Sequence, residues 1–189
     1  SSLWRVTVMI REFQRDDIDK VADIWLNTNI KTHSFIPAQY WKGNFELVKE
    51  RLLQAEVYVY EDDQEIQGFI GMNGEYIEGV FVSDEYQSQG IGARLLNYIK
   101  NNRDKLSLSV YQKNSRAISF YQREGFEIQC EALDEATGEK EYVMIGNQDN
   151  NLPFEREKNP LSKGFFDFID IRKLQDKAKA SHRLSAVLL

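Results

Sequence analysis

A polar loop opens an amphipathic helix at residues 83–96, which read Ser83-Asp84-Glu85-Tyr86-Gln87-Ser88-Gln89-Gly90-Ile91-Gly92-Ala93-Arg94-Leu95-Leu96. Because glycine has no Cβ, Gly90 and Gly92 let a ligand approach the backbone, and the free N–H groups at the start of a helix favour an anion. We therefore predict a cradle for a pyrophosphate group, the alternative being a plain helix start. No Lys-Ser or Lys-Thr pair follows the glycines, so a P-loop is excluded, and Gly-x-Gly-x-x-Arg fits the dinucleotide-binding fingerprint poorly.

A second helix start lies about twenty residues further on. Residues 114–126 read Asn114-Ser115-Arg116-Ala117-Ile118-Ser119-Phe120-Tyr121-Gln122-Arg123-Glu124-Gly125-Phe126. Asn114 or Ser115 can cap this helix, and Gly125 fits the left-handed position after it. A spacing of four places Ala117 and Tyr121 on one helical face, so the small residue leaves room for a ligand beneath the phenol. A phenol with an ordinary pKa of about 10 stays protonated at neutral pH and can donate its proton; the alternative is a half-buried aromatic with its hydroxyl at the surface.

The two motifs together resemble the GNAT superfamily of acetyl-coenzyme A (acetyl-CoA) dependent N-acetyltransferases, and small stand-alone bacterial members in particular. They read Gln87-x-x-Gly90-x-Gly92 and Asn114-x-x-Ala117-x-x-x-Tyr121-x-x-x-Gly125-Phe126. The resemblance covers nearly all of residues 1–146. It implies an α/β (α+β) fold of GNAT type, with a mixed, mostly antiparallel sheet of six to seven strands and about four flanking helices.

The same resemblance implies how the cofactor is held. Acetyl-CoA would be the co-substrate, with no metal, and Tyr121 would protonate the departing thiolate. Backbone groups of one strand would pair with the pantetheine arm and face the thioester oxygen, although Val-Phe-Val is also ordinary composition for a packed central strand. The implied cofactor-binding residues are Val80, Phe81, Val82, Gln87, Ser88, Gln89, Gly90, Ile91, Gly92, Ala93, Asn114, Ala117 and Tyr121.

The acceptor amine must lose a proton before it attacks, which requires a base. Glu78 is the best-placed carboxylate, and strict alternation puts it on one face of its strand with Tyr76 and Val80, unless a bulge shifts the count. Because relatives often carry Glu or His where this chain has Tyr76, we predict deprotonation through a water molecule polarised by Glu78 or another acid. His33 is the alternative base, or a histidine bonded to a loop backbone. The predicted acceptor-binding residues are His33, Phe35, Tyr40 and Tyr76.

Hydrophobic patterns of period two and period 3.6 alternate through the first 146 residues, as is typical of an α/β domain. The first predicted strand starts at Val6. The others cover residues 57–60, 66–72, 76–82, 106–111, 126–131 and 141–145, and a turn at Thr137-Gly138 joins the last two. The first predicted helix is capped by Asp16 or Asp17 and the second follows Asn44. Two more helices are predicted at about residues 90–101 and 115–123. Composition changes near Asn147, so residues 147–189 are predicted to be a linker with a short amphipathic helix, of unassigned role.

Composition limits the remaining possibilities. The 189 residues include 24 Lys and Arg against 30 Asp and Glu, for a net charge of -6, which disfavours a nucleic-acid partner. One cysteine and two histidines leave no usual zinc site and no internal disulfide, so we expect a reducing, cytoplasmic location. No apolar run approaches the ~20 residues that span a bilayer, so we expect no membrane partner.

We therefore expect an N-acetyltransferase that acetylates a primary amine of a small molecule or peptide by direct attack in a ternary complex. A homodimer is a further possible assembly. Acetylation of protein N-termini or aminoacyl-RNA would differ only in the acceptor. The alternative from another class is a non-catalytic acyl-CoA sensing module whose tail docks a partner.

Overall fold

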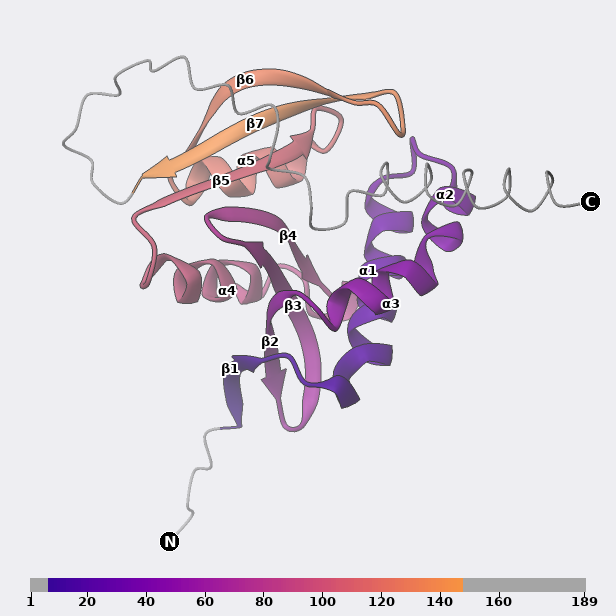
Figure 1. Ribbon diagram of the computed structural model, residues 1–189. Coiled ribbons are helices and arrows are strands. Elements are labelled where there is room, and N and C mark those ends of the chain that lie inside the picture. The colour runs from indigo at the N-terminus through magenta and orange to yellow at the C-terminus, as the bar shows by residue number, and fades with distance from the viewer. Residues whose placement is uncertain (1–6, 148–189) are drawn as a thin grey trace, which may run out of the picture.

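A computed structural model describes residues 7–147 of the chain (Figure 1). Its strands are β1 (Val8–Glu12), β2 (Glu56–Asp62), β3 (Glu65–Asn73), β4 (Tyr76–Val82), β5 (Lys105–Tyr111), β6 (Phe126–Asp134) and β7 (Glu139–Asn147). Its helices are α1 (Ile18–Thr32), α2 (Ala38–Gly43), α3 (Phe45–Leu52), α4 (Ile91–Lys100) and α5 (Ser115–Arg123), with short 3-10 helices η1 (Arg15–Asp17) and η2 (Asp84–Tyr86). The predicted residue Val6 and the predicted segment after residue 147 lie outside the described residues.

The strands form one sheet of seven, in the order β1-β2-β3-β4-β5-β7-β6. Every neighbouring pair is antiparallel except β4 and β5, which run parallel and are connected through α4. The predicted mixed, mostly antiparallel sheet is therefore confirmed. The turn between β6 and β7 is where it was predicted, with Gly138 at a φ of 74°.

The described residues contain five α-helices where about four were predicted. The additional one is α2, a six-residue helix that lies between the first two predicted helices. A helix of fewer than two turns shows too few repeats of the 3.6-residue pattern to be recognised from sequence. Its buried Trp41 anchors it against α1, where the ring of Trp25 lies at 5.8 Å in an edge-on contact.

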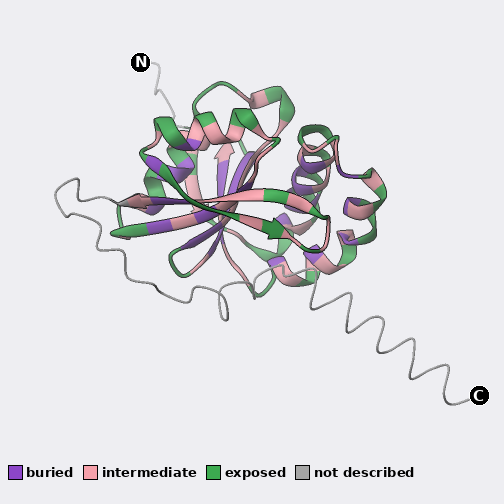
Figure 2. Cartoon of the chain, turned by 90° about the horizontal axis from the view of Figure 1, so that it is seen from above, coloured by how far each residue is buried: buried purple, intermediate pink, exposed green. Residues whose placement is uncertain are grey.

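Two hydrophobic clusters cover the two faces of the sheet. One is formed by α4, α5 and the strand residues beneath them, and includes Leu95 and Tyr121. The other is formed by α1, α2, α3 and the opposite strand face, and includes Trp25 and Phe69. The strands are buried where both layers cover them, and the helices expose their outer sides (Figure 2). The sheet is therefore the wall between two layers, and a site at an opening in the sheet is reached by side chains from both.

Candidate active site

The opening lies between β4 and β5. These two strands pair only at Tyr76–Ser107 and Ile77–Leu108, after which they diverge (Figure 1). A cavity of about 240 Å³ occupies the space between them and is lined by both strands, α1, α2, α5 and the β6–β7 hairpin. Parallel strands that separate leave one edge of β4 without a strand partner in the described part of the chain, and such an edge can accept an extended ligand.

A β-bulge in β4 corrects one prediction about its faces. The register with β3 shifts so that Gly71 pairs with Gly79 while Met72 pairs with Ile77, which makes Glu78 the extra residue. Val80 consequently packs in the same cluster as Ile77, on the α4 and α5 side. Strict alternation, which grouped Val80 with Tyr76 and Glu78, is therefore wrong, because an inserted residue reverses the count beyond it. Both Tyr76 and Glu78 still line the cavity.

The three β4 residues predicted to bind cofactor differ in their surroundings. Val80 and Phe81 line the cavity. The ring of Phe81 stacks on Phe69, with the ring centroids 4.8 Å apart, and packs against the hydrophobic cluster on the α1 side of the sheet. The carbonyl oxygen of Val82 instead accepts a hydrogen bond from Gln87 Nε2 at 3.0 Å, which ties the following loop to the end of the strand.

The predicted phosphate loop has the backbone geometry of an anion cradle. Gly90 is the N-cap of α4 with a φ of 84°, and Ser88 also has a positive φ of 64°. Left-handed residues before a helix turn successive N–H groups toward one point. Arg116 of α5 reaches across and donates to Gln87 Oε1 at 3.1 Å and Ser88 Oγ at 2.8 Å. Within the described chain, residues 88–93 are not among the residues that line the cavity.

Helix α5 carries the second motif as predicted. Asn114 is its N-cap, and Oδ1 accepts a hydrogen bond from the Ala117 N–H at 3.1 Å. Ala117 and Tyr121 both line the cavity, which confirms that they share a helical face. Burial raises the pKa of Tyr121 above its ordinary value, and a hydrogen bond from the backbone of Val80 offsets part of this rise. The phenol is therefore protonated at neutral pH and is held at the open edge of β4.

The side of the cavity that carries the predicted acceptor-binding residues is aromatic. His33, Tyr40 and Tyr76 line it, and Phe35 supports it by edge-on ring contacts with His33 at 5.6 Å and Tyr111 at 5.7 Å. Burial raises the pKa of the Tyr76 hydroxyl, which is also hydrogen-bonded to Ser109. Tyr76 is therefore neutral at physiological pH and does not act as a base.

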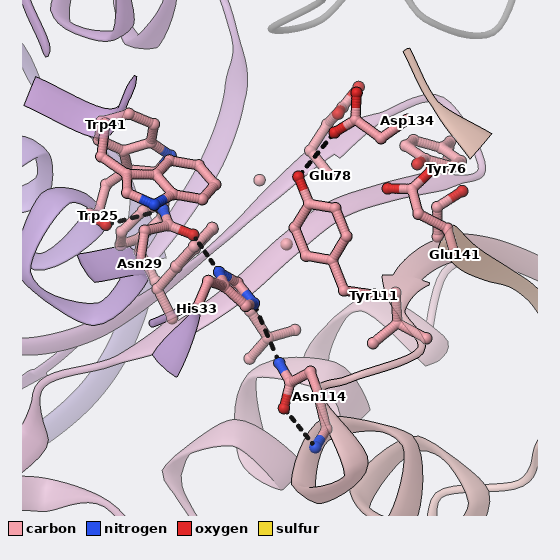
Figure 3. Close-up of a pocket in the computed structure, with 18 of the residues that line it drawn as sticks. Trp25, Asn29, His33, Trp41, Tyr76, Glu78, Tyr111, Asn114, Asp134 and Glu141 are labelled. Carbon is pink, nitrogen blue, oxygen red and sulfur yellow. Dashed lines mark hydrogen bonds between the residues drawn. The ribbon is translucent and has the colours of Figure 1, made fainter. Parts of the chain in front are cut away.

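Both nitrogens of His33 are engaged by side-chain amides. Nδ1 lies 3.0 Å from Asn29 Oδ1, and Nε2 lies 3.2 Å from Asn114 Nδ2 (Figure 3). Burial lowers the pKa of His33 to about 4. This arrangement does not favour His33 as the general base, because each ring nitrogen already has a side-chain amide as its partner.

We expect the depressed pKa of His33 to appear in the pH dependence of stability. Its folded-state pKa of about 4 lies below the ordinary value of 6.5, so between these values the unfolded chain binds more protons. Stability should consequently fall as the pH is lowered from 6.5 to 4, by up to about 3 kcal/mol from this group. Chemical denaturation at several pH values would measure it, with His33→Gln as the non-titrating control. Equal slopes for the two proteins in this window would contradict the assignment.

Three carboxylates line the cavity, and two of them were not predicted. Glu78 comes from β4, Asp134 from the end of β6 and Glu141 from β7. Asp134 accepts a hydrogen bond from the Tyr111 hydroxyl at 2.7 Å (Figure 3). In the sequence, Asp134 lies in an acidic stretch with Glu131, Glu135 and Glu139. Only the pairing of β5 with β7, which sets Tyr111 opposite Glu141, brings this hairpin to the cavity.

Other lining residues that sequence reasoning missed come from the helical layer, from β2, β3 and β5, and from the turn between β6 and β7. They include Trp25, Asn29, Trp41 and Tyr111. Trp25 and Asn29 share one face of α1 at a spacing of four, which is the signal that could have paired them. Among residues 7–147, no three His, Cys, Asp or Glu side chains are grouped so as to hold a metal ion. None of the described helices is long and apolar enough to cross a membrane.

Comparison with known proteins agrees with this geometry. Residues 54–128 match the family model of the acetyltransferase (GNAT) domain. The chain is 38% identical over 130 residues to the peptidyl-lysine N-acetyltransferase YiaC of Escherichia coli K12. This match covers 67% of this chain and 89% of YiaC. It is 30% identical over 122 residues to the peptidyl-lysine N-acetyltransferase YjaB of Salmonella typhimurium LT2, covering 64% of this chain and 84% of YjaB.

The fold is shared with solved structures of the same class. The solution structure of apo YjaB from Escherichia coli matches with a TM-score of 0.67 at 21% identity, over 73% of this chain and 96% of YjaB. Because YiaC is matched over most of its length at well above 30% identity, the family assignment rests on sequence and fold together. The chain belongs to the GNAT acetyltransferases.

Proposed function

We propose that this protein transfers the acetyl group of acetyl-CoA to a lysine side chain or another primary amine, by direct attack in a ternary complex. The observation that carries the proposal is the cavity between the diverging strands. The cavity is lined by Tyr121, whose protonated hydroxyl lies at the edge of β4, and by carboxylates from β4, β6 and β7. A proton donor and a set of acids on one cavity suit a reaction that protonates a leaving group and deprotonates a nucleophile.

The donor side fits acetyl-CoA, the acetyl donor of GNAT acetyltransferases. The open edge of β4 offers backbone groups to an extended pantetheine arm, and the loop at residues 87–93 offers N–H groups to the pyrophosphate. A Cβ at Gly92 would stand 3.4 Å from Phe120 Cζ, an ordinary van der Waals contact, so the bare backbone here leaves a ligand the space that a larger side chain would fill. In the reaction, the amine nitrogen bonds to the thioester carbonyl carbon, the C–S bond breaks, and Tyr121 gives its proton to the thiolate.

The acceptor side favours a cation. Glu78, Asp134 and Glu141 place several acids around one cavity, and aromatic walls of Tyr40, Trp41 and Tyr111 suit an alkyl chain that carries an ammonium group. We favour a lysine in a peptide over a small amine, because both curated relatives described above carry that activity in their names. Their identity of 30 to 38% supports the acceptor class and not a particular peptide.

Deprotonation of the amine is assigned to a water molecule polarised by Glu78. The bulge brings Glu78 to the cavity beside Tyr76, a neutral phenol that cannot take the proton. His33 is unsuited because its ring nitrogens are engaged by Asn29 and Asn114. Glu141 shares this part of the cavity (Figure 3) and is the second acid that can act through water.

Replacing Glu78 with glutamine should lower kcat/KM for a lysine peptide by about 10²-fold, because the carboxylate that accepts the amine proton is lost. Raising the pH toward the lysine pKa of about 10.4 should restore part of the rate, since more free amine is then present. Glu75→Gln, at an exposed position just before β4, is the matched control and should behave as wild type. A pH-independent loss of the same size would indicate that Glu78 has a structural role instead.

Initial-velocity kinetics test the proposal as a whole. Varying acetyl-CoA and a lysine peptide together should give intersecting double-reciprocal lines, as direct attack in a ternary complex requires. Parallel lines would indicate a covalent acetyl-enzyme and overturn the mechanism. Binding of acetyl-CoA without amine-dependent thiol release, over a panel of lysine peptides and polyamines, would favour the non-catalytic sensing module.

Location and assembly stay predictions. The lone cysteine favours a reducing compartment, and we propose the cytoplasm. A homodimer is testable by light scattering at two protein concentrations. The division into an acetyltransferase domain at residues 1–146 and a separate segment at 147–189 is testable by measuring the activity of the full chain after limited proteolysis.

A further inference from the structure

A continuous chain of hydrogen bonds joins the acceptor side of the cavity to the helix that carries Tyr121. It runs from the Trp25 carbonyl through Asn29, His33 and Asn114 to the backbone of Ala117 (Figure 3). The four contacts measure 2.9, 3.0, 3.2 and 3.1 Å in that order. Asn29 is buried on α1, and Asn114 begins α5. The two helices belong to opposite layers of the fold, so this chain crosses the opening in the sheet.

The ends of the chain fix the direction of every bond in it. Asn29 Nδ2 donates to the Trp25 carbonyl, so the other amide atom, Oδ1, faces His33 Nδ1 as an acceptor. Asn114 Oδ1 accepts from the Ala117 N–H, so Nδ2 faces His33 Nε2 as a donor. His33 can satisfy both neighbours only as the neutral tautomer with its proton on Nδ1. An imidazolium would present an N–H to the Asn114 NH₂ group and break the chain there.

We propose that His33 is a positioning residue whose neutral Nδ1–H tautomer fixes the amide of Asn114 and so holds the start of α5, and with it Tyr121, in register with β4. The effect on catalysis rests on the proposed function, whereas the tautomer of His33 does not depend on that function. If the Asn114 amide turned over, its NH₂ would face the Ala117 N–H and the cap of α5 would be lost. The helix that presents Tyr121 is therefore anchored through a residue of the acceptor wall.

The surroundings of His33 favour the neutral ring. It is packed between the rings of Phe35, Trp41 and Tyr111, at centroid distances of 5.6, 5.6 and 5.0 Å. Two charged groups contact these rings: the Lys113 ammonium lies over Phe35, and Asp134 accepts a hydrogen bond from the Tyr111 hydroxyl. The direct partners of both ring nitrogens are neutral amides, which offer an imidazolium no compensating charge.

Two substitutions of His33 separate a positioning role from a base. In glutamine the amide nitrogen and oxygen are spaced much like the two ring nitrogens, so His33→Gln can donate to Asn29 and accept from Asn114 but cannot act as a base. We expect His33→Gln to retain kcat within about threefold, and His33→Leu to lose about tenfold or more, with the KM for acetyl-CoA nearly unchanged. Equal loss in both variants would assign His33 as the base, and wild-type rates in both would remove it from the mechanism.

A spectroscopic readout decides the tautomer independently of catalysis. In ¹⁵N-correlated NMR spectra of the full chain at pH 7, the His33 ring should be neutral with the proton on Nδ1, assigned by the signals that vanish in His33→Gln. Asn114→Asp keeps a good helix cap but places a carboxylate oxygen against Nε2, so the pKa of His33 should rise from about 4 to above 6.5. A proton on Nε2 in wild type, or an unchanged pKa in Asn114→Asp, would overturn the inference even if acetyl transfer is observed. If the chain transfers no acetyl group, the NMR spectra still decide whether His33 has the proposed tautomer.

Discussion

Replacing Tyr121 with phenylalanine should lower kcat by about 10²-fold and leave the Kd of acetyl-CoA within about twofold. The ring of Tyr121 packs edge-on against Phe120 at 5.1 Å and Phe126 at 5.7 Å, and phenylalanine preserves both contacts. What is lost is the hydroxyl at the edge of β4, which burial keeps protonated and a hydrogen bond from the Val80 backbone holds in place. Without it the thiolate has to leave unprotonated or take its proton from water, so the effect falls on kcat and not on cofactor binding.

The control for this substitution is Tyr98→Phe on α4. Tyr98 is 36% exposed and packs against Tyr58, away from the residues that line the cavity. It should leave kcat unchanged. A Tyr121→Phe enzyme with wild-type turnover would show that the proton comes from elsewhere, and a parallel loss of acetyl-CoA affinity would show that the hydroxyl mainly binds the cofactor.

Introducing a negative charge in the phosphate loop should have the largest effect on binding. Gly92→Glu is expected to weaken acetyl-CoA binding by about 100-fold, because a carboxylate would compete with the pyrophosphate for the first turn of α4. The free protein should remain folded, because an acidic residue in the first turn of a helix is favourable. Thermal unfolding shows both effects: acetyl-CoA at 100 times Kd should add about 2.7 kcal/mol of stability to wild type and much less to the variant.

Gly92→Ala is the matched control for charge. A Cβ at this position would lie 3.4 Å from Phe120 Cζ and 3.7 Å from Val80 Cγ1, which are ordinary contacts. The alanine variant should therefore fold normally and bind acetyl-CoA far better than the glutamate variant. If Gly92→Glu binds acetyl-CoA as wild type does, the pyrophosphate is not held at this helix and the cofactor lies elsewhere.

Local sequence patterns predicted the elements whose signals are local. The glycine loop, the capped helix α5 and the turn at Gly138 depend on residues within a few positions of one another, and all three are where they were expected. The shared face of Ala117 and Tyr121 follows from helical spacing alone. Local geometry of this kind needs no knowledge of distant strands, so the conformation of these segments was predicted from the sequence, while their binding of acetyl-CoA stays a prediction.

The side of the cavity that is proposed to bind the acceptor was harder to predict, because long-range contacts build it. The bulge that turns Val80 away from Glu78 depends on the register with β3. Asp134 and Glu141 reach the cavity only because β7 inserts between β5 and β6 in the sheet. The role of His33 depends on Asn114, which is 81 positions away in the sequence. Strand order and register are properties of the whole sheet, and no single stretch of sequence reveals them.

The most direct test of the central claim is the release of CoA thiol from acetyl-CoA in the presence of a lysine-containing peptide. We expect release that depends on both the enzyme and the peptide, with mass spectrometry showing one acetyl group on the lysine side chain. The same peptide with norleucine in place of lysine should give no release above background. Thiol release that is equal with the two peptides, or none with lysine peptides and polyamines although acetyl-CoA binds, would contradict the account.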